Sequence, residues 1–307
     1  MKFATRTLLA STAAIAFALP AMAAGPLVSA DELLTMLSEG KVLALDVREA
    51  AKEGPTAYAK GHIPGSVYAP MDMANWRTTR DGIPAMAPDA DKFQAYMRSL
   101  GLDRGEQVVL IYSGVEPGLG DLAAATRAYW TLKSMGHEKV AILNGGVAGW
   151  AAAGLNLAVS PTEPAAAGNF TARFSDVWLA DAADVQAALT SDVKLIDARP
   201  TGQYAGESKH PKAKKAGHIP GAPNLYGGKL LDGAMVKDAA AIEKLFAEVG
   251  VSASDDVITY CNGGFYCSAI WFAAHEILGY DKVRVYDGSM IDWTQDESRP
   301  VATGPAS

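Results

Sequence analysis

Short runs of β-branched and aromatic residues alternate along the chain with longer stretches in which apolar side chains recur at helical spacing. A continuous apolar run between polar or glycine residues is typical of a buried strand, and helical spacing indicates a helix with one buried face. The first pattern predicts strands at residues 41–46, 107–112, 140–143 and 256–260. The second predicts helices at residues 31–37, 91–100, 122–135 and 268–279. This alternation predicts an α/β fold with a mainly parallel sheet that has helices on both faces.

The chain contains two copies of one succession of motifs. An Asp-x-Arg triplet, a Gly-His-Ile-Pro-Gly segment, a strand end and a glycine-containing turn occur twice in the same order, at nearly constant offset. Such agreement indicates an internal duplication. The paired segments of the two halves are residues 46–48 and 197–199, 61–65 and 217–221, 111–113 and 259–261, and 144–146 and 287–289.

The duplication divides the 307 residues into two domains of ordinary size. A stretch rich in proline and alanine lies between them and has linker composition. Ligands of parallel α/β folds bind beyond the carboxyl ends of the strands, where Ser113 stands in the first half and Cys261 in the second. Because an unactivated serine is a poor nucleophile, the first domain is predicted to be the non-catalytic copy. The expected boundaries are 1–23 for a signal peptide, 24–159 for the N-terminal domain, 160–170 for the linker and 171–307 for the catalytic C-terminal domain.

The first residues have the pattern of an export signal. Lys2 and Arg6 precede an apolar stretch, residues 8–19, which is followed by the small-residue motif at 21–23. The apolar stretch is too short to span a bilayer as a helix. We therefore expect cleavage after Ala23, a periplasmic or secreted product, and no membrane insertion of the mature chain.

Composition and charge narrow the classes of partner. Apolar residues make up 49% of the chain and charged residues 20%, which describes a folded soluble protein. The formal net charge is −7, and removal of Lys2 and Arg6 with the signal makes it more negative. This balance argues against nucleic acid or an anionic lipid surface as the main partner.

Both cysteines lie in one decapeptide, residues 259–268, which begins in a predicted strand and ends in a predicted helix. Cys261 therefore stands at a strand end, ahead of a loop with two glycines and a helix N-terminus. Loop N–H groups and the helix dipole stabilise a sulfur anion in such a place, and they lower the pKa of a thiol from its usual value of ~8.5. Cys261 is the candidate catalytic residue. The candidate substrate-binding residues are Asn262, Gly263, Gly264, Phe265, Tyr266, Cys267 and Arg199.

The motifs together resemble those of the tandem-domain rhodaneses, which are sulfurtransferases. The resemblance covers nearly the whole mature chain and includes, besides the duplicated segments, Pro200, Tyr204, Gly206 and Trp293. It implies two tandem rhodanese-like domains with an active-site loop in the second only. It also implies a cysteine that cycles between thiolate and persulfide, moving sulfane sulfur from a small anionic donor to a thiol or other nucleophile. No metal or organic cofactor is required.

The donor stays open between the thiosulfate and 3-mercaptopyruvate classes. Family members specialised for thiosulfate carry basic residues directly after the cysteine, where this chain has Asn262 and Gly263. Many two-domain members have an arginine where this chain has Gln203. The following loop carries four lysines that either replace this charge or form a solvated charged surface. They are Lys209, Lys212, Lys214 and Lys215.

Cys267 has two interpretations. It is either a small residue that packs where the helix starts, or a resolving thiol that attacks a persulfide or sulfenic acid on Cys261. The second interpretation gives the alternative function, a periplasmic thiol–disulfide redox or sulfur-carrier protein. A Cys-x5-Arg phosphatase is excluded, because Cys267 stands at the position where that family carries its phosphate-binding arginine.

Two further sets of polar residues are interpreted as structural. The histidines of the repeated segments, His62 and His218, lack partners at metal-ligand spacing, so we expect no metal site. Asp46 and Asp197 each precede an arginine by two residues, and we expect buried ion pairs or loop anchors there.

Overall fold

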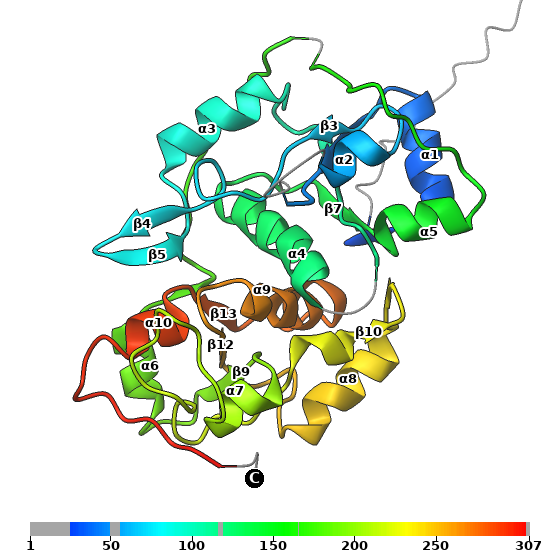
Figure 1. Ribbon diagram of the computed structural model, residues 1–307. Coiled ribbons are helices and arrows are strands. Elements are labelled where there is room, and N and C mark those ends of the chain that lie inside the picture. Colours follow the sequence, from blue (N-terminus) through cyan, green and yellow to red (C-terminus); the bar gives the residue numbers. More distant parts are fainter. Residues whose placement is uncertain (1–24, 50–55, 116–118, 165, 305–307) are drawn as a thin grey trace, which may run out of the picture.

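Two parallel sheets, one in each half of the chain, form the framework of the protein (Figure 1). The computed structural model describes residues 25–49, 56–115, 119–164 and 166–304, so the predicted export signal lies outside the described residues. The first sheet has the order β1-β7-β6-β2-β3 and the second β8-β13-β12-β9. The predicted fold of two tandem α/β domains is confirmed, and both sheets use the same strand order for the duplicated strands.

Every strand pair within the two sheets is parallel. The central strands consist of apolar runs because helices cover both faces of each sheet. The first sheet comprises β1 (Leu27–Val28), β2 (Val42–Asp46), β3 (Val67–Tyr68), β6 (Gln107–Ile111) and β7 (Val140–Leu143). The second comprises β8 (Leu179–Ala180), β9 (Lys194–Asp197), β12 (Val257–Tyr260) and β13 (Val283–Tyr286). Strands β6 and β12 occupy equivalent places, so Ser113 and Cys261 follow equivalent strand ends.

The helices begin and end largely where the sequence pattern predicts. The first starts after Ser29, whose hydroxyl accepts the Glu32 N–H while the Glu32 carboxylate accepts the Ser29 N–H. Helices of the first domain are α1 (Ala30–Ser38), α2 (Ala57–Lys60), α3 (Ala90–Ser99), α4 (Leu119–Ser134) and α5 (Gly146–Ala152). Those of the second are α6 (Ala182–Ala188), α7 (Thr201–Ala205), α8 (Ala239–Glu248), α9 (Tyr266–Trp271) and α10 (Ser289–Trp293), with a 3₁₀ turn η1 (Gly227–Leu230).

The helix after Cys261 differs from its prediction in two respects. It begins at Tyr266, two residues early, because the Ser268 hydroxyl donates to the Phe265 carbonyl and closes the first turn at 2.6 Å. Beyond α9 it widens into a π-helix, η2 (Phe272–Ile277), in which the Leu278 N–H donates to the Ala273 carbonyl. It ends at Ile277, and Gly279, the predicted stop, follows two residues later with φ +71°. No helix of the described part of the chain is long and apolar enough to cross a membrane.

The apolar core has three parts. One cluster lies on the outer face of the first sheet and includes Leu33 and Trp150, and another lies on the outer face of the second and includes Trp293. The third is shared by both domains, which meet through α4 and α9, and it joins Trp130 to Trp271. Because this interface is a continuous apolar core, the two domains form one structural unit.

Two β-hairpins link the domains reciprocally. The hairpin of β4 (Thr78–Arg80) and β5 (Ile83–Met86) belongs to the first domain, and the N–H of the next residue, Ala87, donates to the Asp287 carboxylate at 2.6 Å. The hairpin of β10 (Leu231–Asp232) and β11 (Met235–Val236) belongs to the second, and its Val236 N–H donates to the Asn144 side chain at 2.8 Å. Asp287 and Asn144 are equivalent in the duplication. Each hairpin therefore reaches the carboxyl end of the other domain's sheet.

Candidate active site

Cys261 is the first residue after β12, at the carboxyl end of the second sheet. Its loop is fixed to the start of α10, because the Met290 N–H donates to the Cys261 carbonyl and the Ile291 N–H to the Asn262 carbonyl, at 3.1 and 3.0 Å. Gly264 has φ +79°, a conformation that favours glycine, and it turns the chain toward α9. The structure thus has Cys261 at the end of a strand and ahead of a helix, where the sequence pattern predicts it.

Two side chains adjoin the Cys261 sulfur. The Cys267 thiol donates to it at a Sγ–Sγ distance of 3.4 Å, and the Ser289 hydroxyl oxygen lies 4.0 Å away. Both cysteines are free, and Cys261 is only 1% exposed. The sulfur is thus held among hydrogen-bond donors and has little contact with solvent.

The two thiols have opposite acidities. Burial alone would raise the pKa of the Cys261 thiol, but hydrogen bonds from the Cys267 side chain, from the Cys267 and Gly263 backbone and from Ser289 outweigh it and lower the pKa to about 6. Burial and the neighbouring Cys261 raise the pKa of Cys267 well above its ordinary value. At neutral pH the pair consists of a thiolate at Cys261 and a protonated donor at Cys267.

Ser289 was not among the predicted site residues. Its hydroxyl accepts the Cys261 N–H at 3.0 Å and the Gly264 N–H at 3.4 Å. Its single proton is directed either to the Tyr286 carbonyl at 2.7 Å or to the Cys261 sulfur at 4.0 Å. Ser289 has φ 51°, in the left-handed region where the equivalent residue of the first domain is Gly146. The sequence could have indicated this role, because the duplication places a serine where the first domain has a glycine. A non-glycine residue in this strained conformation is usually found where its side chain has a function.

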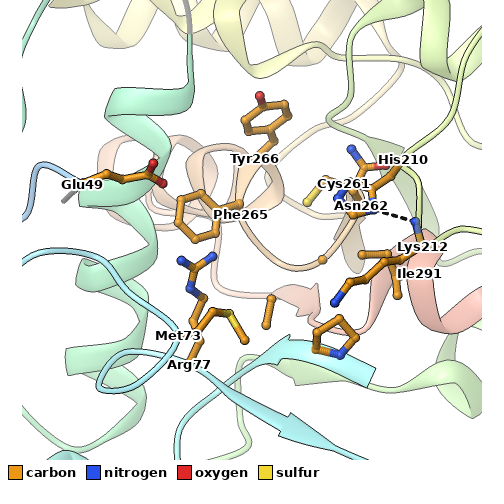
Figure 2. Close-up of a pocket in the computed structure, with 13 residues that line it drawn as sticks. Glu49, Met73, Arg77, His210, Lys212, Cys261, Asn262, Phe265, Tyr266 and Ile291 are labelled. Atoms are coloured by element: carbon orange, nitrogen blue, oxygen red, sulfur yellow. Dashed lines mark hydrogen bonds between the residues drawn. The ribbon is translucent and has the colours of Figure 1, made fainter. Parts of the chain in front are cut away.

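The Cys261 sulfur faces a pocket of about 390 Å³ between the two domains (Figure 2). The decapeptide supplies one wall, and the β4–β5 hairpin of the first domain, with the segment before it, supplies the opposite wall. Apolar side chains predominate, and Arg77 and Lys212 bring positive charge from opposite sides. The lining residues are Glu49, Met73, Arg77, Pro84, Ala85, His210, Lys212, Cys261, Asn262, Gly263, Phe265, Tyr266 and Ile291.

Arg77 comes from the first domain, and sequence reasoning did not identify it. Its guanidinium lies over the Phe265 ring at 4.6 Å, and Nη2 donates to the Met71 carbonyl at 3.3 Å. Burial, and then the nearby charge of Arg127, lower the pKa of Arg77. The stacked ring and the carbonyl orient a half-buried cation at the mouth of the cysteine pocket.

The predicted substrate-binding residues divide between the pocket and the surrounding structure. Asn262, Gly263, Phe265 and Tyr266 line the pocket, whereas Gly264 and Cys267 lie behind its wall. Arg199 does not line it either. Its guanidinium is buried, forms an ion pair with Asp197 and donates to the Gly217 carbonyl at 2.7 Å. The prediction that Arg199 contacts substrate therefore needs correction, because its donors anchor the loop after β9.

The lysine-rich loop contributes one residue to the pocket. Lys212 lines it, but Lys209, Lys214 and Lys215 donate to backbone carbonyls outside it. Gln203 also has a role, because its side chain accepts a hydrogen bond from the Asn262 amide at 2.8 Å. Two of the positions at which the sequence departs from the rhodanese pattern, Asn262 and Gln203, thus contact each other.

The residues interpreted as structural have that role in both halves. His62 stacks on Tyr58 at 3.7 Å and His218 on Tyr204 at 3.8 Å, and each Nδ1 contacts the carbonyl of the same tyrosine. The expected buried ion pairs of Asp46 with Arg48 and of Asp197 with Arg199 are present. Among the described residues, no group of three or more His, Cys, Asp or Glu side chains could hold a metal ion.

The equivalent place in the first domain is closed. Tyr112 donates to the Ala234 carbonyl in the β10–β11 hairpin at 2.7 Å, and the space left beneath the hairpin is about 10 Å³. Ser113 does not line that space. The described pocket beneath this hairpin is therefore far smaller than the one that Cys261 lines, and the non-catalytic role of the first domain stays a prediction.

Comparison with known proteins places the chain among sulfurtransferases. The family model described as "Rhodanese-like domain" matches residues 29–153 and 181–296. The chain is 30% identical over 281 residues to 3-mercaptopyruvate sulfurtransferase of Escherichia coli K12, covering 89% of this chain and 96% of that protein. It is 33% identical to a probable 3-mercaptopyruvate sulfurtransferase of Pseudomonas aeruginosa, covering 92% and 100%. A putative thiosulfate sulfurtransferase, SseB of Mycobacterium tuberculosis, is 32% identical, with 91% and 98% covered.

Solved structures show the same fold. The 3-mercaptopyruvate sulfurtransferase SseA of E. coli superposes with a TM-score of 0.75 at 29% identity, covering 87% of this chain and 99% of SseA. A complex of EanB with ergothioneine gives a TM-score of 0.78 at 22% identity, covering 92% of this chain and 71% of EanB. At that identity the second similarity concerns the fold alone.

Proposed function

The chain belongs to the rhodanese family and is a sulfurtransferase of the thiosulfate or 3-mercaptopyruvate type, and we propose that Cys261 carries the sulfur as a persulfide. The observation that carries this proposal is the lowered pKa of Cys261, to about 6, at a sulfur that faces a pocket with two cations. A thiolate at neutral pH is the nucleophile that sulfur transfer needs.

The proposed reaction has two steps. In the first, the Cys261 thiolate attacks the donor sulfur, an S–S bond forms, and the bond from that sulfur to the rest of the donor breaks. The departing fragment takes the electron pair, as sulfite from thiosulfate or as the enolate of pyruvate, which is then protonated. In the second, an acceptor thiolate attacks the outer sulfur of the persulfide and Cys261 leaves as a thiolate. No oxidant or reductant is consumed.

The loop supports both steps through its hydrogen bonds. Cys267, protonated at neutral pH, donates to the Cys261 sulfur, and this bond stabilises the thiolate both before attack and after departure. Hydrogen bonds from the Gly263 and Cys267 backbone also stabilise the Cys261 thiolate and lower its pKa. Because these donors are already oriented, they require little reorganisation when charge develops on sulfur.

We further propose that the donor is of the 3-mercaptopyruvate class, a small organic thiol with a carboxylate. The pocket walls are largely apolar, including Met73, Phe265 and Ile291, which suits an organic body better than a compact inorganic dianion. Arg77 and Lys212 stand on opposite sides of the pocket and can pair with the carboxylate. The chain is similar to relatives named for either donor, so the relatives do not decide between the two. The choice of donor rests on the chemistry of the pocket.

Arg77→Met is expected to raise KM for 3-mercaptopyruvate by roughly 10- to 100-fold, because it removes a charge-assisted hydrogen bond. Lys212→Met is expected to act in the same direction with a smaller effect, since Lys212 is exposed. Steady-state assays with a thiol acceptor measure both. The matched control is Arg80→Met, because Arg80 lies three residues further on, in β4, but pairs with Asp89 outside the pocket. An unchanged KM in Arg77→Met would remove Arg77 from donor binding.

The close approach of the two sulfurs favours a second candidate function, thiol–disulfide exchange between Cys261 and Cys267. With the sulfurs 3.4 Å apart, oxidation by a disulfide substrate would join them, releasing two electrons and two protons to that substrate. Thiol counts before and after treatment with oxidised glutathione test this. Loss of both thiols without a bound glutathione, together with a stable mixed disulfide of glutathione on Cys261 in Cys267→Ser, supports exchange. Two persisting free thiols, with sulfur transfer retained in Cys267→Ser, leave Cys267 as a hydrogen-bond donor and packing residue.

We also propose that the protein acts outside the cytoplasm, on the basis of the N-terminal sequence pattern. The mass of the mature N-terminal peptide from fractionated cells tests this. A periplasmic chain that begins after Ala23 supports export, and an uncleaved cytoplasmic chain contradicts it.

A further inference from the structure

We propose that Arg127, a residue of the non-catalytic first domain, is a positioning residue for the sulfur-carrying loop, which it holds through Gly264 and Asp287. The inference rests on the proposed role of Cys261. It gives the first domain a part in the reaction that neither the sequence motifs nor the pocket lining reveals.

Arg127 lies on α4 and is completely buried at the domain interface. Its Nη1 donates to the Gly264 carbonyl at 3.1 Å and forms an ion pair with Asp287 at 2.6 Å. Its Nη2 donates to the Ala85 carbonyl of the β4–β5 hairpin at 3.4 Å, and the guanidinium lies over the Trp130 ring at 4.6 Å. One planar group thus joins the active-site loop, the start of α10 and the hairpin that lines the pocket.

The active-site loop packs directly against this pair. A Cβ atom at Gly264 would overlap both the Asp287 carboxylate and the Arg127 guanidinium. While this pair stands behind the loop, residue 264 must therefore be a glycine, and the loop is in direct contact with the pair.

Asp287 carries the effect to the sulfur. It precedes Gly288 and Ser289, and the Ser289 hydroxyl accepts the N–H groups of Cys261 and Gly264. Arg127 therefore fixes both sides of the sulfur, Gly264 by a direct hydrogen bond and Ser289 through Asp287.

The duplication supplies an internal comparison. In the first domain the equivalent residue, Asn144, accepts the Val236 N–H just as Asp287 accepts the Ala87 N–H. A neutral side chain is therefore sufficient to dock a hairpin. Buried ion pairs contribute little net stability, because both charges must be desolvated. Docking of the domains therefore does not explain why Arg127 and Asp287 are charged. Orientation of the active-site loop does explain it.

Several titratable or charged groups surround Cys261, and the test must separate Arg127 from them. From the other elements these are Cys267 and Tyr266 on α9, Asp197 at the end of β9 with Arg199 after it, and Asp287 before α10. The pocket adds Glu49, Arg77, His210 and Lys212. Arg127→Lys keeps the charge beside Asp287 but lacks the planar fork that reaches Gly264, Asp287 and Ala85 together. The double variant Arg127→Met with Asp287→Asn removes both charges and leaves no unpaired buried ion.

The experiment measures the pH profile of Cys261 alkylation by iodoacetamide, located by peptide mass, and kcat and KM for sulfur transfer. Both variants are expected to move the midpoint of the profile upward by about one pH unit and to lower kcat about tenfold or more, with a smaller change in KM. The matched control is Tyr129→Phe. It removes another buried hydrogen bond between the domains, from Tyr129 to Glu276 at 2.7 Å, without touching the loop, and is expected to leave the midpoint and kcat unchanged.

A wild-type midpoint and kcat in a folded Arg127→Lys variant and a folded double variant would overturn the proposal. So would failure of both variants to fold at 25 °C while Tyr129→Phe folds, because the pair would then serve stability alone. Alkylation does not depend on any sulfur donor. A shifted profile in a protein that transfers no sulfur would therefore uphold the positioning role and refute the proposed function instead.

Discussion

Replacement of Cys261 by serine is expected to abolish sulfur transfer, with a loss of kcat/KM on the order of 10³-fold or more. A hydroxyl in this place stays protonated at neutral pH, whereas the Cys261 thiol has a pKa lowered to about 6. It also cannot hold a transferable second sulfur. Initial rates with 3-mercaptopyruvate and with thiosulfate, each with a thiol acceptor, measure the loss.

The control for this variant is Ser113→Ala, which changes the equivalent position of the first domain. Because the space there is about 10 Å³ and Ser113 does not line it, its kcat/KM is expected to match that of the wild type. Substantial activity in folded Cys261→Ser would contradict a persulfide at this position. Loss of activity in Ser113→Ala would mean that the first domain has a catalytic role of its own.

Gly264→Ala is expected to destabilise the protein by about 2–4 kcal/mol and to impair transfer strongly, for two separable reasons. The residue has φ +79°, which costs an alanine about 1 kcal/mol. The added Cβ also overlaps the Arg127–Asp287 pair, so the buried ions or the loop must move. Denaturant unfolding and transfer assays on the same preparation measure both effects.

Gly250→Ala separates the two contributions. Gly250 has φ +70°, but a Cβ there meets no atom within 4 Å, so only the backbone cost of about 1 kcal/mol remains. Equal losses of stability in the two variants would show that the loop moves to accept the added Cβ at little cost. That result would contradict the close packing of Gly264 against Arg127 and Asp287.

The sequence was sufficient for the features that depend on local pattern. Buried strands such as β6 and β12 follow from continuous apolar runs, and the duplication identified Cys261 as the thiol at a strand end. The glycines around it predicted a loop able to hold an anion. These inferences succeeded because strand ends, turns and helix starts are determined mainly by neighbouring residues.

The rest of the site depends on contacts between distant segments. Arg77 and Arg127 lie far from Cys261 in the sequence and reach its loop only because the two domains share a core. Arg199 failed as a predicted ligand for a related reason. A motif indicates which residues are adjacent in sequence, but only the packing shows that the arginine is occupied by Asp197 and the Gly217 carbonyl.

The first domain therefore contributes more than its missing nucleophile indicates. It supplies Arg77 and the β4–β5 hairpin as one wall of the pocket, and it places Arg127 behind the active-site loop. We propose that this domain binds the donor and positions the active centre of the second domain. An isolated second domain would lack both functions.

The central claim is that Cys261 carries the transferred sulfur. It is tested most directly by mass spectrometry of the protein after incubation with 3-mercaptopyruvate and removal of the donor, without reductant. The account predicts a gain of one sulfur atom, which peptide mapping locates on Cys261. A thiol acceptor removes this sulfur, and Cys261→Ser does not gain it. An unmodified protein after treatment with 3-mercaptopyruvate and with thiosulfate, or sulfur located on Cys267 in place of Cys261, would contradict it.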